Sequence, residues 1–529
     1  MTQTKTAAII GAGIAGVAAA IRLAVRGYRV EVFEANAYPG GKLSSFDVTG
    51  SDGGMYRFDA GPSLFTMPHL VDELFRLAGR NPGDFFEYIR LDETCRYFWD
   101  DGTRLTAWAD RQAFAREVEQ KLGEPASHLL DHLDDSAAKY RITEKLFLHR
   151  SLHKLSTWVN RDALNGYLNL PKLGVFGTMN RANERRFRHP KLVQLFNRYA
   201  TYNGSDPYQT PATMNIIPHL EYNIGAFFPK DGMIGITNSL VRLAEDLGVR
   251  FHFNTRVTEV VTEGKKVVGI KVEKGRKGGR DRAAGRERRK KMEESIVEDQ
   301  PFLLSSFPSF LPFSLLISNM DVVNTFRKLL PHARQPERIL RQPKSSSGLI
   351  FYWGIRRKFP ELGLHNIFFS NDYREEFEQL FRKNNLTDDP TVYLNITSKH
   401  KPDDAPADGE NWFLLINAPN NTGQNWDTLI DRTRRNVIRK LSHNLGVDVE
   451  PLITGEAILD PRSIEARTSS SQGALYGNSS NNRFAAFLRH ANFSRDFDNL
   501  YFVGGSVHPG GGIPLCLLSA KIATDLING

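Results

Sequence analysis

The sequence has little cysteine and no long apolar run. Cys95 and Cys516 are the only cysteines among its 529 residues, so neither a disulfide framework nor a metal site is predicted, and a reducing compartment is expected. The nearest candidate for a membrane span, residues 302–317, contains two prolines and is shorter than the roughly 18 residues that a spanning helix needs. The first residues lack the charged and apolar regions of a secretory signal. We therefore expect no export and no membrane-spanning helix.

Excess positive charge is confined to one segment. The formal net charge is +9, but residues 274–291 hold ten Lys or Arg against two acids, which leaves +1 for the rest of the chain. This distribution argues against a nucleic-acid partner. Such a run is typical of a solvated, disordered segment and less often of a patch that contacts an anionic membrane or a nucleic acid. We predict that residues 274–314 form a disordered or atypical insert.

The strongest local pattern lies at the amino-terminal end. A short apolar run at residues 7–10 predicts a strand, and an alanine-rich helical pattern follows after a glycine-rich turn. A second predicted strand, residues 29–34, ends in Glu34. This order is that of a dinucleotide-binding βαβ unit. The turn consists of Gly11, Ala12, Gly13, Ile14, Ala15 and Gly16.

Each part of this unit has a physical reason. Gly11 makes the tight turn, Gly13 lets the backbone approach a pyrophosphate, and Gly16 allows the helix to pack closely. The amino terminus of the helix offers unpaired N–H groups to the phosphate charge. Glu34 is placed to accept hydrogen bonds from the ribose hydroxyls, and its charge would repel a 2′-phosphate, which disfavours NADP.

Further glycine-rich sites indicate a flavin dinucleotide bound along its length. Gly40, Gly41 and Lys42 follow the acid, and Gly61 and Pro62 come about 20 residues later. A third site near the carboxyl end includes Gly504, Gly505, His508, Gly512, Ile513 and Pro514. These motifs resemble the flavoproteins that include amine oxidases, protoporphyrinogen oxidase and the bacterial carotenoid desaturases. Across nearly the whole chain the sequence looks like a phytoene-desaturase-type carotenoid desaturase.

The resemblance implies an α/β fold, with a Rossmann-like FAD-binding domain of the amine oxidase and phytoene desaturase type and a mixed sheet-and-helix substrate domain. The FAD-binding domain would be discontinuous and comprise residues 1–70, 230–335 and 450–529. The substrate and membrane-contacting domain would comprise residues 71–229 and 336–449.

The resemblance also implies FAD as cofactor and assigns contacts to it. The glycine turn, Glu34 and the Gly40–Lys42 segment would hold its adenosine and phosphate parts, with Val257 near the adenine. Gly504 and Gly505 would lie against the diphosphate or ribityl chain. The segment from Gly512 through Ile513 to Pro514 would run beneath the isoalloxazine ring, with Gly61 and Pro62 beside the flavin.

His508 has two open interpretations. It can lie over the reactive edge of the flavin as a catalytic residue, or it can hydrogen-bond the backbone of its own glycine loop. No other catalytic residue or catalytic base is identified from the sequence.

The resemblance implies a desaturase of carotenoid biosynthesis that removes a hydride and a proton from a polyene. The runs 345–355, 365–373 and 395–419 look most like the 1-hydroxycarotenoid 3,4-desaturases. Phytoene desaturase, carotene isomerase and a flavin amine oxidase-like enzyme remain as alternatives, together with a lipid-binding relative that lacks enzymatic activity. The implied partners are a long apolar carotenoid, a membrane surface, and oxygen or a quinone as electron acceptor. The expected location is cytoplasmic, with peripheral attachment to a membrane.

Overall fold

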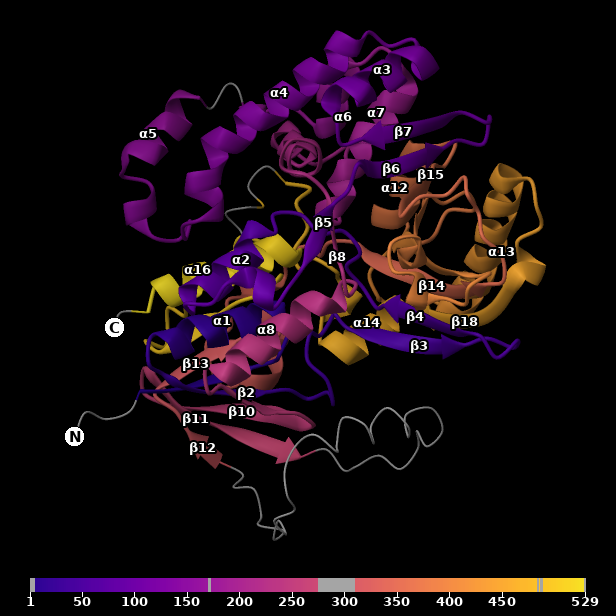
Figure 1. Ribbon diagram of the computed structural model, residues 1–529. Coiled ribbons are helices and arrows are strands. Elements are labelled where there is room, and N and C mark those ends of the chain that lie inside the picture. The colour runs from indigo at the N-terminus through magenta and orange to yellow at the C-terminus, as the bar shows by residue number, and fades with distance from the viewer. Residues whose placement is uncertain (1–4, 170–172, 275–309, 483–484, 486–488, 528–529) are drawn as a thin grey trace.

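The computed structural model describes residues 5–169, 173–274, 310–482, 485 and 489–527, which build two sheet-centred regions (Figure 1). Most of the predicted insert, residues 275–309, lies outside this described part. Within the described part, no helix is both long enough and apolar enough to cross a membrane. The chain passes between the two regions several times, so each is assembled from distant segments.

The first region is built on a five-stranded parallel sheet in the order β19-β13-β1-β2-β9. The bounds of these strands are β1 (Thr6–Ile10), β2 (Arg29–Phe33), β9 (Arg250–His252), β13 (Leu315–Ser318) and β19 (Leu500–Phe502). Helices on one face are α1 (Ile14–Val25), α2 (His69–Leu77), α8 (Ile234–Asp246) and α16 (Ile513–Asp525) (Figure 1). Four alanines of α1 are buried, because their small side chains let α1 pack tightly between the sheet and α16: Ala15, Ala18, Ala19 and Ala20.

A three-stranded antiparallel sheet packs against the other face of this region. Its strands are β10 (Thr255–Glu263), β11 (Lys266–Lys274) and β12 (Phe310–Pro312). Strand β12 pairs with β11 in the register Ile270 to Leu311. The prediction of a disordered or atypical insert is therefore wrong at its carboxyl end, because Phe310–Pro312 forms the third strand of this sheet.

The second region is built on a seven-stranded mixed sheet in the order β18-β14-β17-β16-β15-β6-β7. The bounds are β6 (Glu93–Phe98), β7 (Arg104–Trp108), β14 (Ser347–Ile355), β15 (His365–Phe368), β16 (Val392–Asn395), β17 (Glu410–Ala418) and β18 (Ile453–Leu459). Helix α13 (Trp426–Leu445) covers one face through an apolar core that includes Trp353 and Trp412. Strand β18 falls in the range 450–529 that the sequence suggested for the FAD-binding domain, yet it pairs with β14 in this sheet.

A mostly helical region packs on the other side of this sheet, near β6 and β7 (Figure 1). Its helices are α3 (Arg111–Leu122), α4 (Ala126–Thr143), α5 (Arg161–Leu168), α6 (Met179–Arg186) and α7 (Pro190–Asn197). The other strands and α-helices of the described part are β3 (Ser45–Thr49), β4 (Met55–Asp59), β5 (Tyr88–Arg90), β8 (Phe227–Pro229), α10 (Val322–Asn324), α11 (Glu337–Leu340), α12 (Tyr373–Phe381) and α14 (Pro461–Thr468). The β3-β4 and β5-β8 pairs are two-stranded antiparallel sheets between the two regions.

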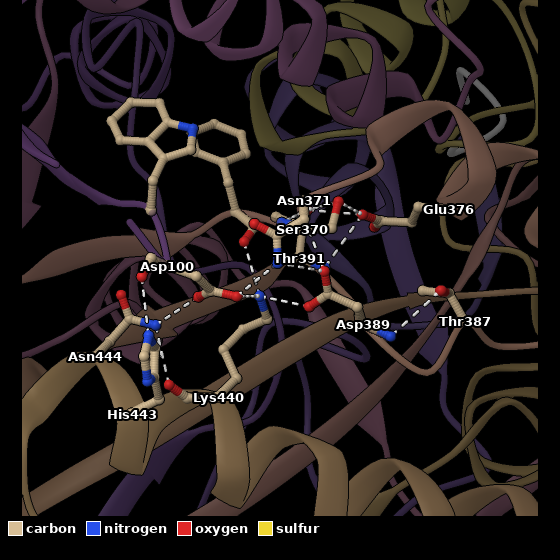
Figure 2. A network of polar contacts seen from close by, with 12 residues as sticks. Asp100, Ser370, Asn371, Glu376, Thr387, Asp389, Thr391, Lys440, His443 and Asn444 are labelled. Atoms are coloured by element: carbon tan, nitrogen blue, oxygen red, sulfur yellow. Dashed lines mark hydrogen bonds and ion pairs between the residues drawn. The ribbon is translucent and has the colours of Figure 1, made fainter. Parts of the chain in front are cut away.

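A polar network joins α13 to the loops at one end of this sheet (Figure 2). The buried Lys440 ammonium lies 2.6 Å from an Asp389 oxygen and 3.3 Å from an Asp100 oxygen, and it donates to the Phe369 carbonyl. Burial alone would raise the pKa of Asp100, but the hydrogen bond from Asn444 and the Lys440 charge outweigh it and lower this pKa. The network therefore fixes the helix to the sheet.

Replacing Lys440 tests the energy of this network. We expect Lys440→Met to lower the free energy of unfolding by about 1–3 kcal/mol, because it leaves two carboxylates without their cation. Denaturant titration measures the change. Since the folded pKa of Asp100 is lowered, its contribution is present above the unfolded pKa and is lost as the pH falls through the folded pKa. The matched control is Lys383→Met, whose ion pair with Glu375 is exposed, so this substitution should lower the free energy of unfolding much less than Lys440→Met does. Equal losses in the two variants would contradict the assignment.

Candidate functional site

The carboxyl ends of β1, β13 and β19 meet around the side chain of Asn319. Its amide nitrogen Nδ2 lies 3.3 Å from the Gly11 carbonyl oxygen and donates to it. A Cβ on Gly13 would lie 2.7 Å from Asn319 Nδ2, and a Cβ on Gly504 would lie 2.7 Å from Asn319 Oδ1. Glycine is therefore needed at positions 13 and 504 because the Asn319 side chain leaves no room for a Cβ there, in addition to any role of these glycines toward a ligand.

The first turn of α1 has the features of a phosphate site. Gly11 has a φ of +92°, and a Cβ on Gly16 would lie 2.2 Å from the Gly11 carbonyl oxygen, so only glycine allows this close approach. Gly13 is the N-cap residue, and no side chain caps the helix. With Ala12, Ile14 and Ala15 buried behind it, the amino terminus of α1 presents its backbone N–H groups to an anion. These residues fit a dinucleotide pyrophosphate.

Glu34 directly follows β2 and its side chain reaches back to the glycine turn. The Ala12 N–H donates to Glu34 Oε2 at 2.8 Å, and Asn36 donates to Oε1 from its backbone and its side chain. The side chain is buried, so the three donors offset the desolvation of the carboxylate. Oε2 accepts only one of these three bonds, so it can still accept a further hydrogen bond, such as one from a ribose hydroxyl.

The Gly40–Lys42 segment lies directly beside this turn. The Gly40 N–H donates to the Ala12 carbonyl at 2.8 Å, and a Cβ on Gly41 would lie 3.7 Å from the Gly13 Cα. The Lys42 ammonium donates to the carbonyls of Ala474 and Leu475 at 3.2 and 2.9 Å. Burial lowers the pKa of Lys42, although the nearby Asp321 carboxylate opposes this. Lys42 thus holds a distant segment against the glycine-rich elements.

The Gly61–Pro62 loop packs against the same segment. A Cβ on Gly61 would lie 2.4 Å from the Lys42 carbonyl oxygen, so the two loops touch through their backbones. At the other end, Val257 of β10 packs with Ile10 and Phe33 in an apolar cluster. The Thr255 N–H donates to the Glu34 carbonyl at 2.8 Å, which brings the start of β10 to the end of β2.

The carboxyl-terminal glycine loop forms a flat backbone wall before α16. Gly505 approaches the Gly511 backbone, and a Cβ on Gly511 would lie 2.8 Å from the Tyr476 Cα. Gly512 has a φ of +104°, and a Cβ there would meet nothing within 4 Å. Helix α16 then begins at Ile513, followed by Pro514. A crowded inner side and an open outer side fit a loop that receives a flat ring.

Arg489 is a buried residue of this wall that the sequence did not single out. Its guanidinium donates to the carbonyls of Tyr476 and Gly505 at 3.0 and 3.3 Å and to that of Asn478 at 2.9 Å. Burial lowers the pKa of Arg489 to about 10. Arg489 therefore fixes the segment 476–478 to the glycine loop. Nothing in its local sequence indicates this role, because every acceptor is a backbone carbonyl.

His508 connects the glycine loop to the helical region. Its Nε2 donates to the Arg150 carbonyl at 2.9 Å, its backbone N–H donates to the His490 carbonyl, and its own carbonyl accepts from Asn492. Burial lowers the pKa of His508 to about 4, so the ring is neutral near neutral pH. One sequence-based interpretation was a hydrogen bond from His508 to the backbone of its own glycine loop, but the ring instead bonds the carbonyl of Arg150 in the helical region. This geometry supports a positioning role for His508.

The substitution His508→Ala separates positioning from catalysis. A positioning residue predicts a loss of about 1–3 kcal/mol in unfolding free energy, with turnover per bound flavin retained. Because the folded pKa of about 4 lies below the ordinary value of 6.5, the contribution of neutral His508 is lost as the pH falls from 6.5 to 4. Denaturation at several pH values measures this. Unchanged stability with a large fall in the anaerobic flavin reduction rate would instead identify a catalytic residue.

Comparison with known proteins identifies the family. Residues 14–284 match the family model described as flavin containing amine oxidoreductase. The chain is 48% identical over 523 residues to a 1-hydroxycarotenoid 3,4-desaturase of Flavobacterium sp. (strain P99-3), covering 99% of each chain. It is 32% identical to a 4,4'-diapolycopene oxygenase of Methylomonas sp., covering 98% of this chain and 97% of the relative.

Solved structures agree in fold. Wild-type putrescine oxidase bound to putrescine superposes with a TM-score of 0.57 at 14% identity, covering 99% of both chains. An oxidoreductase from Methanosarcina mazei gives a TM-score of 0.57 at 13% identity, covering 98% of this chain and 100% of the other. The α/β fold class and the FAD cofactor expected from the sequence are confirmed. The chain therefore belongs to the FAD-dependent carotenoid desaturases within the flavin-containing amine oxidoreductase family.

Proposed function

We propose that this chain is an FAD-dependent desaturase that introduces the 3,4 double bond into a 1-hydroxycarotenoid. The observation that carries the proposal is the 48% identity to a 1-hydroxycarotenoid 3,4-desaturase over 99% of both chains. The glycine-lined turn, the acid at the end of β2 and the open outer side of Gly512 support the same activity, because together they fit an extended flavin dinucleotide.

The reaction removes two hydrogens from carbons next to a polyene. Such a C–H bond has no acidic proton, so one carbon must lose a hydride and its neighbour a proton. Bound FAD supplies the two-electron acceptor for this chemistry, and oxygen or a quinone is the proposed final acceptor. The protein residues bind, orient and exclude water. In this proposal the α1 turn and Glu34 hold the adenosine and phosphate parts, Gly504 and Gly505 would support the diphosphate or ribityl chain, and the segment 512–514 would support the ring.

An anaerobic conversion experiment tests this function. The FAD-loaded protein is mixed with a 1-hydroxycarotenoid in liposomes, and the products are analysed by mass and absorption spectra. We expect a product lighter by two hydrogens with a longer conjugated system. A product of unchanged mass would indicate an isomerase, and no product from any carotenoid would contradict the proposal.

A matched pair of glycine variants tests the position of the ring. Gly512 and Gly27 both have positive φ and open space around a Cβ, but Gly27 lies in the turn after α1, away from the glycine loop. Both Gly512→Val and Gly27→Val should destabilise the fold by about 1–3 kcal/mol through backbone strain. Only Gly512→Val should abolish the conversion, because its side chain enters the space proposed for the isoalloxazine. Full activity and FAD content in Gly512→Val would contradict this assignment.

We also propose that the chain docks on a membrane through an apolar surface around α5. We call this surface the α5 patch, and it consists of Leu155, Val159, Leu164, Leu168 and Phe176. Their exposed fractions range from 58% to 88%. Helix α5 projects from the outer end of the helical region (Figure 1). A cluster of large exposed apolar side chains marks an interaction surface, and the proposed substrate is itself dissolved in lipid.

Vesicle binding tests the α5 patch. The double variant Leu168→Ser and Phe176→Ser should lower partitioning onto phosphatidylcholine vesicles by roughly tenfold or more, because two apolar side chains no longer enter the lipid. FAD content should not change. The control Ile458→Ser alters an exposed apolar residue on β18, remote in sequence from the patch, and should leave partitioning unchanged. Equal partitioning of the double variant and the unmodified protein in a co-sedimentation assay would contradict this surface.

A further inference from the structure

A chain of hydrogen bonds leads from the Gly61–Pro62 loop into the seven-stranded sheet. Ser63 directly follows this loop, and its Oγ lies 2.8 Å from the Tyr393 hydroxyl. The same hydroxyl lies 2.8 Å from His365 Nδ1. Asn395, which is paired with His365 across β16 and β15, places its Nδ2 at 3.2 Å from this nitrogen. This series of hydrogen bonds therefore begins beside the proposed flavin site and ends at the ring of His365.

The surrounding groups decide which nitrogen of His365 carries the proton. Asn395 Nδ2 also donates to the Leu364 carbonyl at 3.0 Å, so it is the amide nitrogen that faces the ring. An amide nitrogen can only donate, so His365 Nδ1 must be the acceptor. Burial lowers the pKa of His365 to about 3, so the ring is neutral and its single proton is on Nε2.

The Nε2 donor of His365 has no hydrogen-bond acceptor among the residues that the structure describes. The atom is buried, and the side chain as a whole is 3% exposed. Buried polar groups in folded proteins are nearly always paired, because an unpaired donor loses free energy relative to its hydrated state. An unpaired N–H at this position therefore indicates a partner that is not part of the chain.

The face of the seven-stranded sheet that carries His365 is partly accessible to solvent, although β16 and β17 are interior strands of this sheet. Tyr393 on β16 and Leu415 and Asn417 on β17 are only partly buried, whereas most of their neighbours along these strands are buried. Tyr393 and Leu415 are paired, and alternate residues of a strand share a face. Leu415 and Leu475 both approach Gly348, and the Leu475 carbonyl is held by Lys42. An accessible space over this face thus adjoins the segment attached to the glycine-rich elements.

We propose that His365 Nε2 donates a hydrogen bond to the terminal hydroxyl of the carotenoid and so determines the preference for a hydroxylated substrate. The inference rests on the proposed function. In a 1-hydroxycarotenoid the hydroxyl is on carbon 1, two carbons from the reacting 3,4 bond, so its binding group must lie near the flavin. The bonds from Ser63 to Tyr393 and from Tyr393 to Nδ1 polarise the ring and strengthen the Nε2–H donor.

Two amide variants of His365 test the proposal. The terminal amide of Gln occupies about the place of Nε2, whereas that of Asn occupies about the place of Nδ1. His365→Asn retains an acceptor for Tyr393 but places no donor at the Nε2 position, so the preference in kcat/KM for a hydroxylated over an unhydroxylated carotenoid should fall by about 10- to 100-fold. His365→Gln should retain most of the preference. The dissociation constant for the hydroxylated carotenoid, measured by tryptophan fluorescence quenching, should rise more in His365→Asn than in His365→Gln.

The outcomes separate this inference from the proposed function. If the unmodified protein converts no carotenoid, the proposed function fails. If it converts hydroxylated carotenoids preferentially and His365→Asn keeps the same preference, a buried water is the partner of Nε2 and the inference is wrong. Equal losses on both substrates would indicate a purely structural histidine. Should His365→Asn fail to fold or to bind FAD, Tyr393→Phe provides the second test, because it removes the donor to Nδ1 and should weaken the preference several-fold.

Discussion

The arrangement depends on the close approach of three backbone segments at the carboxyl edge of the parallel sheet. Asn319 lies at the centre of this approach, bonds the Gly11 carbonyl and leaves no room for a Cβ on Gly13 or Gly504. These segments come from the beginning, middle and end of the chain. A larger side chain at either glycine would separate strands that must lie side by side in the sheet. The same lack of side chains leaves the backbone N–H groups of α1 open to a phosphate.

Most of the wall around the proposed flavin site is held by bonds to backbone carbonyls. Lys42 donates to the segment 474–475, Arg489 to three further carbonyls, and His508 to Arg150. In all three side chains burial lowers the pKa, so desolvation favours the neutral form. This arrangement fits a site in which the cofactor supplies the redox chemistry and the protein supplies shape and position.

The seven-stranded sheet has two faces of different character. One face packs an apolar core under α13. The opposite face carries Tyr393, Asn395 and His365, which are joined by hydrogen bonds. Polar groups in such a place lower stability unless they are paired, and an incompletely paired one is consistent with selection for binding rather than for folding.

The sequence by itself determined the βαβ unit, because the strand, glycine turn, helix and terminal acid are contiguous within residues 6–34. The further glycine-rich motifs at residues 40–42, 61–62 and 504–514 then indicated the flavin cofactor and the family. Only the tertiary structure decided the place of β18, the strand formed by Phe310–Pro312, and the partners of Arg489 and His508. His508 and Arg150 are 358 residues apart, and the acceptor is a carbonyl that every residue type carries. A local pattern therefore cannot encode such a contact, whereas the periodicity and glycine spacing of a single βαβ unit can be read directly.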